Sequence, residues 1–205
     1  MFLVIEGIEG SGKSTLVSAL AERLRGEGHD VMVTREPGGT PLGDAVRKIF
    51  LDRQIAIEPL TEALLVNAAR AQHVGEVIRP ALAANKVVVC DRFTDSTIAY
   101  QGYGRGLDLV SIRAMCDTAT EGLEPDLVLL VDVPVGLARA RLQERSQALD
   151  RVESENDRFH ELVRHGYLEL ADSPRHRVLD GALPRAPLLE RALREVREWM
   201  NVRVR

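Results

Sequence analysis

The eight residues Gly7-Ile-Glu-Gly-Ser-Gly-Lys-Ser14 restrict the possible folds of this 205-residue chain more than any other segment. They match the pattern G-x-x-x-x-G-K-[ST], whose backbone N–H groups curl around phosphate oxygens at the start of a helix. The run Phe2–Ile5 before them is continuously apolar, as in a strand buried on both faces. The residues after them place three leucines on one helical face: Leu16, Leu20 and Leu24. The segment therefore predicts a strand, a phosphate loop and a helix that together bind a nucleoside triphosphate.

The residue types in this loop suggest separate tasks. We expect Lys13 to reach the β and γ phosphates and the Ser14 hydroxyl to lie near Mg²⁺. A strand, turn and helix without a ligand is the alternative, and the strand and helix on either side of the motif argue against it. The positions that we assign to triphosphate binding are Gly7, Gly10, Ser11, Gly12, Lys13, Ser14 and Thr15.

Four further apolar runs alternate with helical stretches, at residues 31–34, 87–90, 126–131 and 176–179. This alternation is typical of βαβ units and a parallel sheet. We predict an α/β fold of the P-loop NTPase class, with a five-stranded parallel sheet, helices on both faces and one domain over residues 1–205. Residues 139–155 are rich in Arg, Glu, Gln and Ser, and we expect them to form a mobile lid.

Composition and charge limit the possible partners. The 27 basic and 31 acidic residues give a net charge of −4, which argues against nucleic acid as the main partner. No apolar run approaches the roughly 20 residues that a membrane span needs, and the first residues lack the basic region of a signal peptide. Two cysteines, Cys90 and Cys116, are too few for a disulfide framework. We therefore expect a cytoplasmic protein with no membrane partner.

Charged residues follow the third apolar run. Asp91 and Arg92 should emerge at the carboxyl edge of the sheet beside the phosphate loop, where Asp91 can hold Mg²⁺ through water and Arg92 can bind a second phosphate. A solvated pair at a strand end is the alternative. The same topology can bring three arginines from separate segments to one crevice, although each alone is also typical of a surface residue: Arg35, Arg47 and Arg70.

The expected lid holds a further supply of positive charge. Transfer of a phosphoryl group needs cationic groups around it, and the phosphate loop offers Glu9 but no arginine. The lid arginines are Arg139, Arg141, Arg145 and Arg151. A solvated helix face is the alternative, in which they pair with the neighbouring acidic residues Glu144, Asp150 and Glu153.

Several longer strings resemble the thymidylate kinase family, in its bacterial branch. Arg35-Glu-Pro-Gly38 together with Asp91-Arg-Phe and Ala99-Tyr-Gln-Gly102 is much more specific than the phosphate loop, which other nucleoside monophosphate kinases share. The resemblance runs over nearly the whole chain. Its strings are Phe2–Thr15, Thr34–Thr40, Arg70 with Gln72-His73, Asp91–Gly102, Leu149–Glu153 and Tyr167–Leu170.

The resemblance implies an activity, ATP + dTMP → ADP + dTDP with Mg²⁺, and a set of residue roles. Arg92 would bind the acceptor phosphate with help from Arg47, and Arg70 would bond the thymine ring. Tyr100 would lie under the sugar. Further positions of the acceptor site would be Glu9, Pro37, Ser96, Thr97 and Gln101. Mg²⁺ would be held through Ser14, Glu9 and Asp91.

The resemblance also places the catalytic arginine in the lid. We predict Arg145 for the phosphate clamp and Arg151 as its support. The predicted catalytic set is then Glu9, Lys13, Asp91, Arg92, Arg145 and Arg151. A cis Glu36–Pro37 bond is implied as well, and so is a two-fold homodimer formed by apolar helices over residues 61–84 and from residue 108 onward.

One position departs from the family pattern. Where the family usually has an aromatic residue one helical turn before Arg70, this chain has Val66, which packs on a ring with less contact area and no π-stacking. Two other functions therefore stay open at this point. One is a kinase for another pyrimidine nucleoside monophosphate with an altered base pocket, and the other is a non-catalytic regulatory protein that binds a nucleotide.

Overall fold

The computed structural model describes residues 1–145 and 148–203. Within them, five parallel strands form one sheet in the order β2-β3-β1-β4-β5. The strands are β1 (Phe2–Glu6), β2 (Val31–Arg35), β3 (Val87–Asp91), β4 (Leu127–Asp132) and β5 (His176–Asp180). Each matches one of the predicted runs to within one residue at either end, so the expected five-stranded parallel sheet is confirmed.

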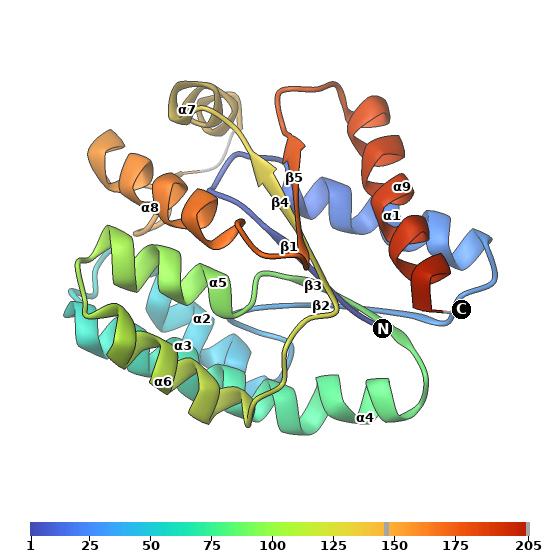
Figure 1. Cartoon of the computed structure of the whole chain (residues 1–205). Helices are drawn as coiled ribbons and strands as arrows, with labels where there is room; N and C mark the ends of the chain where they lie inside the picture. The colour runs from blue at the N-terminus through green and yellow to red at the C-terminus, as the bar shows by residue number, and fades with distance from the viewer. Residues whose placement is uncertain (146–147, 204–205) are drawn as a thin grey trace.

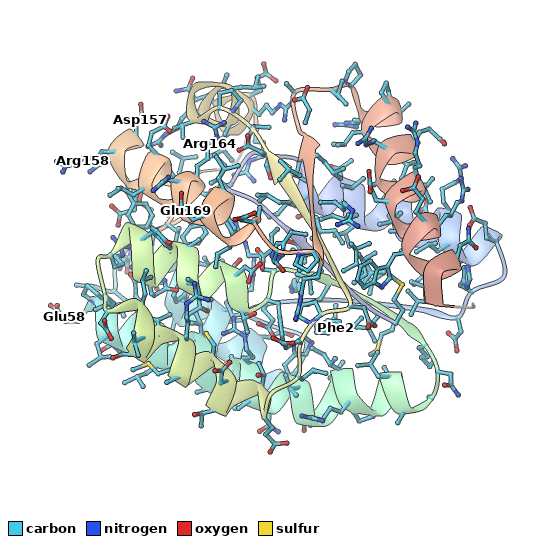
Figure 2. The ribbon with its side chains drawn as sticks, in the orientation of Figure 1. Phe2, Glu58, Asp157, Arg158, Arg164 and Glu169 are labelled. Atoms are coloured by element: carbon cyan, nitrogen blue, oxygen red, sulfur yellow. The ribbon has the colours of Figure 1, made fainter. Side chains whose placement is uncertain are left out.

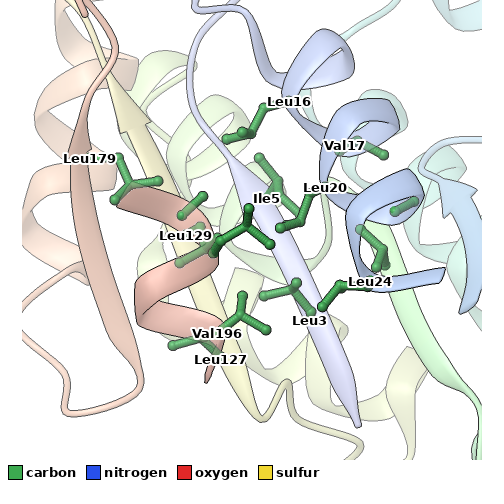
Figure 3. Close-up of a cluster of buried hydrophobic side chains, with 14 of the residues drawn as sticks. Leu3, Ile5, Leu16, Val17, Leu20, Leu24, Leu127, Leu129, Leu179 and Val196 are labelled. Atoms are coloured by element: carbon green, nitrogen blue, oxygen red, sulfur yellow. The ribbon is translucent and has the colours of Figure 1, made fainter. Parts of the chain in front are cut away.

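Helices cover both faces of the sheet, as the alternation predicted (Figure 1). Side chains of β1 alternate between the faces. Leu3 and Ile5 pack against helices α1 (Lys13–Gly26) and α9 (Arg185–Arg203), as Figure 3 shows, whereas Phe2 belongs to the core on the opposite face. Packing on both faces therefore holds β1 in place and positions the phosphate loop, which begins where β1 ends.

On the opposite face, a long helical segment runs from Pro59 to Ala83. A π-helical stretch, η1 (Val74–Ile78), joins α3 (Pro59–His73) to α4 (Arg79–Ala83), and Pro80 lies in the first turn of α4. Pro80 thus lies where the regular α-helix begins again after the π-helical stretch. The remaining elements are α2 (Pro41–Leu51), α5 (Thr94–Thr97), η2 (Ile98–Gly104), α6 (Leu109–Thr120), α7 (Val135–Gln143) and α8 (Asp157–Leu170).

The segment expected to form a lid, residues 139–155, is partly packed onto the body of the protein. Ser146 and Gln147 lie outside the described residues. Val152 is buried in a cluster that includes Phe50 and Phe159, so this part of the segment is not exposed to solvent although most of its residues are polar. Burial of Val152 and the bonds of Arg151 to Glu62 and to the Phe50 carbonyl oxygen hold this end of the segment on the body of the protein, and its mobility stays a prediction.

Among the described helices, none has both the length and the apolar run that crossing a bilayer would require.

Candidate active site

A cavity of about 810 Å³ lies at the carboxyl edge of the sheet, beside the ends of β1, β2 and β3. Parallel strands end at the same edge, so residues far apart in the sequence meet there. The predicted site residues that line it are Glu9, Gly10, Lys13, Ser14, Pro37, Arg47, Val66, Arg70, Asp91, Arg92, Ser96, Thr97, Tyr100, Gln101 and Arg145. Four others complete the loop and the first turn of α1: Gly7, Ser11, Gly12 and Thr15.

The phosphate loop is closely packed against the strand and helix beside it. A Cβ at Gly7 would fall on the carbonyl oxygen of Val131, and one at Gly10 would fall on that of Ala138. Both positions also have positive φ, at 141° and 75°, so the loop needs glycine there. The Lys13 side chain is only 6% exposed, and its Nζ donates to the carbonyl oxygen of Ile8 at 2.8 Å. Burial, with repulsion from Arg92 second, lowers the pKa of Lys13 to about 8.

Oxygen groups from two segments meet at the start of α1. Ser14 Oγ donates to Asp91 Oδ2 at 2.7 Å, and Glu9 lines the same cavity. The described residues contain no group of three or more His, Cys, Asp or Glu side chains that could hold a metal ion. Mg²⁺ is usually held by one or two protein oxygen groups together with water and substrate phosphates. A hydroxyl and carboxylates beside a phosphate loop fit that mode of binding.

Arg92 is held in position by four side chains. Its Nη1 donates to Ser96 Oγ at 3.1 Å and to Tyr167 Oη at 2.8 Å. Its Nη2 donates to Glu9 Oε1 at 2.7 Å and to Tyr100 Oη at 3.2 Å, and Tyr100 also bonds the second oxygen of Glu9. Burial raises the pKa of Glu9, but Arg92 and Lys13 outweigh it, so this pKa lies below its ordinary value. The guanidinium is therefore oriented before any substrate binds.

A fully buried carboxyl group behind Arg92 was missed by sequence reasoning. Glu6, the last residue of β1, is 0% exposed and accepts hydrogen bonds from Phe93, Ser96 and Tyr167. Burial and the neighbouring Asp95 raise the pKa of Glu6 to about 7, although Arg92 and two hydrogen bonds lower it. The available signal was an acidic residue that ends an apolar strand directly before the phosphate loop.

Arg70 also lines the cavity, and its side chain is only 2% exposed. Hydrogen bonds hold it in place. Its Nε donates to Glu36 Oε2 at 2.7 Å, its Nη1 to Asn67 Oδ1 and its Nη2 to the Phe93 carbonyl oxygen, both at 2.9 Å. The second oxygen of Glu36 lies 2.9 Å from His73 Nδ1. This network of buried groups leaves the arginine one fixed orientation.

The chain turns sharply after Glu36. The Glu36–Pro37 bond is cis, which confirms the expectation from the family resemblance. Arg47 Nη1 donates to the carbonyl oxygen of Pro37 at 3.2 Å. Burial, with repulsion from Arg35 and Arg92, lowers the pKa of Arg47. The guanidinium groups of Arg35, Arg47 and Arg92 therefore repel one another where they line the cavity, and a bound anion would relieve this repulsion.

The lid arginines point in different directions. Arg145 lines the cavity and pairs with Glu153 at 2.6 Å. Arg151, which sequence reasoning placed beside it, donates instead to the Phe50 carbonyl oxygen at 2.8 Å and pairs with the buried Glu62. Spacing along a lid does not define which way each side chain turns. In this structure only Arg145 of the two predicted lid residues faces the cavity.

The other two lid arginines hold backbone. Arg141 donates to the carbonyl oxygens of Ser11, in the phosphate loop, and Gly181, at 3.3 and 2.9 Å. Arg139 donates to the carbonyl oxygen of Glu153 at 3.0 Å and pairs with Asp157 at 2.8 Å, at the outer end of α8 (Figure 2). These contacts give both arginines a structural task within the described residues.

Transfer of a phosphoryl group from a triphosphate to a second phosphate ester needs two sets of anion-binding groups around one cavity. The phosphate loop and the arginines around Arg92 meet this requirement, and with the sheet topology they define the class of P-loop nucleotide kinases. A family model described as thymidylate kinase matches residues 5–188. The chain belongs to the thymidylate kinase family.

Individual relatives agree with the family match. The thymidylate kinase of Geotalea uraniireducens is 53% identical, over 88% of this chain and 89% of that protein. That of Desulfovibrio desulfuricans is 51% identical, over 90% and 89%. The crystal structure of thymidylate kinase from Ehrlichia chaffeensis superposes with a TM-score of 0.71 at 36% identity, over 87% of this chain and 91% of that one. These matches confirm the family resemblance and the P-loop fold.

Proposed function

We propose that this member of the thymidylate kinase family transfers the γ-phosphoryl group of ATP to dTMP within the cavity, with Mg²⁺ as the metal ion, and releases ADP and dTDP. The observation that carries the proposal is the meeting of Lys13 and its loop with Arg92 and Arg47 around one cavity. Family membership supports dTMP as the acceptor. The two other functions left open by the sequence, a kinase for another pyrimidine monophosphate and a non-catalytic regulatory protein, lack this support.

An assay of ADP release tests the substrate. Purified protein is given ATP and Mg²⁺ with dTMP, dUMP, dCMP, UMP or CMP in turn, and ADP release is followed by a coupled reaction. We expect dTMP to give the highest kcat/KM of the five. A higher value for another monophosphate would identify a changed base pocket, and no turnover with any of them would identify a binding protein.

On the donor side, the loop from Gly7 to Thr15 would hold the triphosphate through backbone N–H groups and the Lys13 ammonium group. Ser14, Asp91 and Glu9 would hold Mg²⁺, directly or through water. The metal ion, when bound, supplies positive charge that neutralises the phosphate oxygens. The buried Lys13 adds charge that interacts most strongly with the transition state, because little water screens it.

On the acceptor side, Arg92 and Arg47 would bind the phosphate of dTMP, and Arg70 would bond the base. Tyr100 and Gln101 would lie along the sugar and base, together with the neighbouring Pro37, Ser96 and Thr97. A phosphate monoester has a second pKa near 6, so it is largely dianionic at neutral pH and needs no strong general base. The task of these residues is then orientation, charge neutralisation and exclusion of water.

Val66 lines the cavity in the same apolar cluster as Phe50 and Tyr100, and it leaves less contact area for the base than an aromatic residue would. We predict that Val66→Phe lowers the KM for dTMP by a factor of a few, equivalent to about 0.5–1.5 kcal/mol. Steady-state kinetics with varied dTMP checks this. An unchanged or raised KM would mean that Phe50, which also lines the cavity, already covers the base.

We further infer that the protein is a homodimer. The sequence pointed to the helices over 61–84 and from 108, but four apolar residues of these helices are buried in the chain's own core: Ala69, Val74, Ile78 and Ile112. The apolar surface that remains is smaller and lies on the neighbouring helices α3 and α6, with Leu64 53% and Val110 76% exposed. A two-fold pairing of these helices would cover both surfaces with their own copies.

Sedimentation equilibrium at micromolar concentration tests the dimer. We expect twice the 22.7 kDa chain mass for the wild type. Leu64→Glu with Val110→Glu should shift the species to the monomer, because a charge would be buried without a partner. A wild type at 22.7 kDa would contradict the inference.

The proposal keeps two expectations from the sequence: a cytoplasmic location and no nucleic-acid partner. Both described thiols, Cys90 and Cys116, are free and buried, in agreement with a reducing cytoplasm. The net charge of −4 supports the expectation that nucleic acid is not a partner.

A further inference from the structure

Glu6 is a buried acidic residue that the roles assigned above do not use. It ends β1 immediately before Gly7, the first residue of the phosphate loop, and its side chain is inaccessible to solvent. The groups that bond it are the backbone N–H of Phe93 and Ser96 and the hydroxyls of Ser96 and Tyr167. Burial of a carboxylate is costly, so these hydrogen bonds must compensate for the lost hydration.

The two hydroxyl groups connect Glu6 to Arg92. Ser96 Oγ donates to Glu6 Oε2 at 2.6 Å, and Tyr167 Oη donates to the same oxygen at 2.9 Å. Each hydroxyl has one proton. Ser96 Oγ and Tyr167 Oη also lie 2.8 Å apart, but an ionised carboxylate is a stronger acceptor than a hydroxyl and draws both protons. With both protons directed at Glu6, the lone pairs of Ser96 and Tyr167 are available to Arg92 Nη1, which donates to them at 3.1 and 2.8 Å. The carboxylate thereby determines the orientation of the hydroxyls, and the hydroxyls determine that of the guanidinium.

Glu6 also holds the backbone from which Arg92 projects. Arg92 has φ of +75°, an uncommon conformation for an arginine. The next peptide N–H, that of Phe93, donates to Glu6 Oε1 at 2.7 Å. One carboxylate therefore holds both the turn after β3 and the end of the Arg92 side chain.

We propose that Glu6 is a positioning residue for the acceptor phosphate, and that it acts by orienting Ser96, Tyr167 and the backbone at Phe93 so that Arg92 meets the phosphate in one geometry. This inference rests on the proposed role of Arg92 as the acceptor-phosphate ligand. It predicts a defect that is specific to the acceptor, because Glu6 acts on Arg92 and touches neither substrate.

Glu6→Gln tests the proposal with little change in size. The amide cannot accept from both hydroxyls while it also bonds the backbone, so at least one hydroxyl loses the partner that orients it. At pH 8 we expect the KM for dTMP to rise about tenfold or more and the KM for ATP to change less than about twofold. The matched control is Glu195→Gln, a buried glutamate on α9 that pairs with Arg177 and Arg191 and should leave both KM values unchanged.

A double-mutant cycle with Tyr167→Phe separates this role from general destabilisation. If Glu6 and Tyr167 act on Arg92 through the same hydrogen bonds, the KM for dTMP of the double variant should be little higher than that of the more affected single variant. Multiplied effects, or equal rises in both KM values, would overturn the proposal. If Glu6→Gln does not fold, Tyr167→Phe alone must raise the KM for dTMP selectively, and an unchanged value would also overturn it. Failure of the wild type to phosphorylate dTMP would instead refute the proposed function.

Discussion

Lys13→Ala is expected to reduce the kcat for dTMP phosphorylation to nearly the background rate while the protein stays folded. Lys13 is buried in the first turn after the phosphate loop, where its charge is poorly screened and would face the β and γ phosphates of ATP under the proposed function. Interactions with charge that develops in the transition state affect kcat more than substrate binding. Steady-state kinetics together with thermal unfolding measure both parts of this expectation.

A surface lysine provides the control for this variant. Lys86 is distant in sequence from the phosphate loop, its side chain is 38% exposed, and it pairs with Asp30. Lys86→Ala should therefore keep the activity of the wild type. If Lys13→Ala retained even about a tenth of the wild-type kcat, the loop would not stabilise the transferred phosphoryl group as proposed.

Loss of the lid arginine that faces the cavity is expected to have the second largest effect. Arg145→Ala should reduce kcat about a hundredfold, with smaller changes in either KM, because Arg145 lines the cavity and an arginine that reaches the transferred group would act mainly in the transition state. Arg151→Ala should lower kcat as well. It would do so through the lid, since Arg151 joins this segment to Glu62 and Phe50.

The matched control is Arg158→Ala on α8. Arg158 is exposed and projects outward at the end of that helix (Figure 2), so its loss should not change kcat. The role of the lid would be refuted if the double variant Arg145→Ala with Arg151→Ala kept full activity. Full activity in the Arg145 variant alone would transfer the catalytic role to Arg151, which would then have to leave Glu62 during turnover.

The strands and the phosphate loop could be predicted because their signals are local. The strands β1, β3 and β4 are almost continuous apolar runs, and the loop follows directly after β1. The acceptor side depends on contacts between distant segments. Glu6 and Tyr167 are 161 positions apart and meet at 2.9 Å, a contact that no spacing in the chain predicts.

The direction of individual side chains was the least predictable feature. Arg145 and Arg151 have similar surroundings in the sequence, yet a buried Glu62 from α3 draws only Arg151 away from the cavity. The apolar helices raised the same difficulty, since a single amphipathic pattern does not distinguish the buried Ile112 from the exposed Leu64.

Separate binding of the two nucleotides tests the central claim, that ATP and dTMP occupy different anion sites in one cavity. Isothermal titration calorimetry with dTMP, and with a non-hydrolysable ATP analogue and Mg²⁺, is carried out on Lys13→Ala and Arg92→Ala. We predict a crossed result: Lys13→Ala weakens the ATP analogue about tenfold or more and spares dTMP, and Arg92→Ala does the reverse. Equal weakening of both ligands by each variant, or the opposite assignment, would contradict the account.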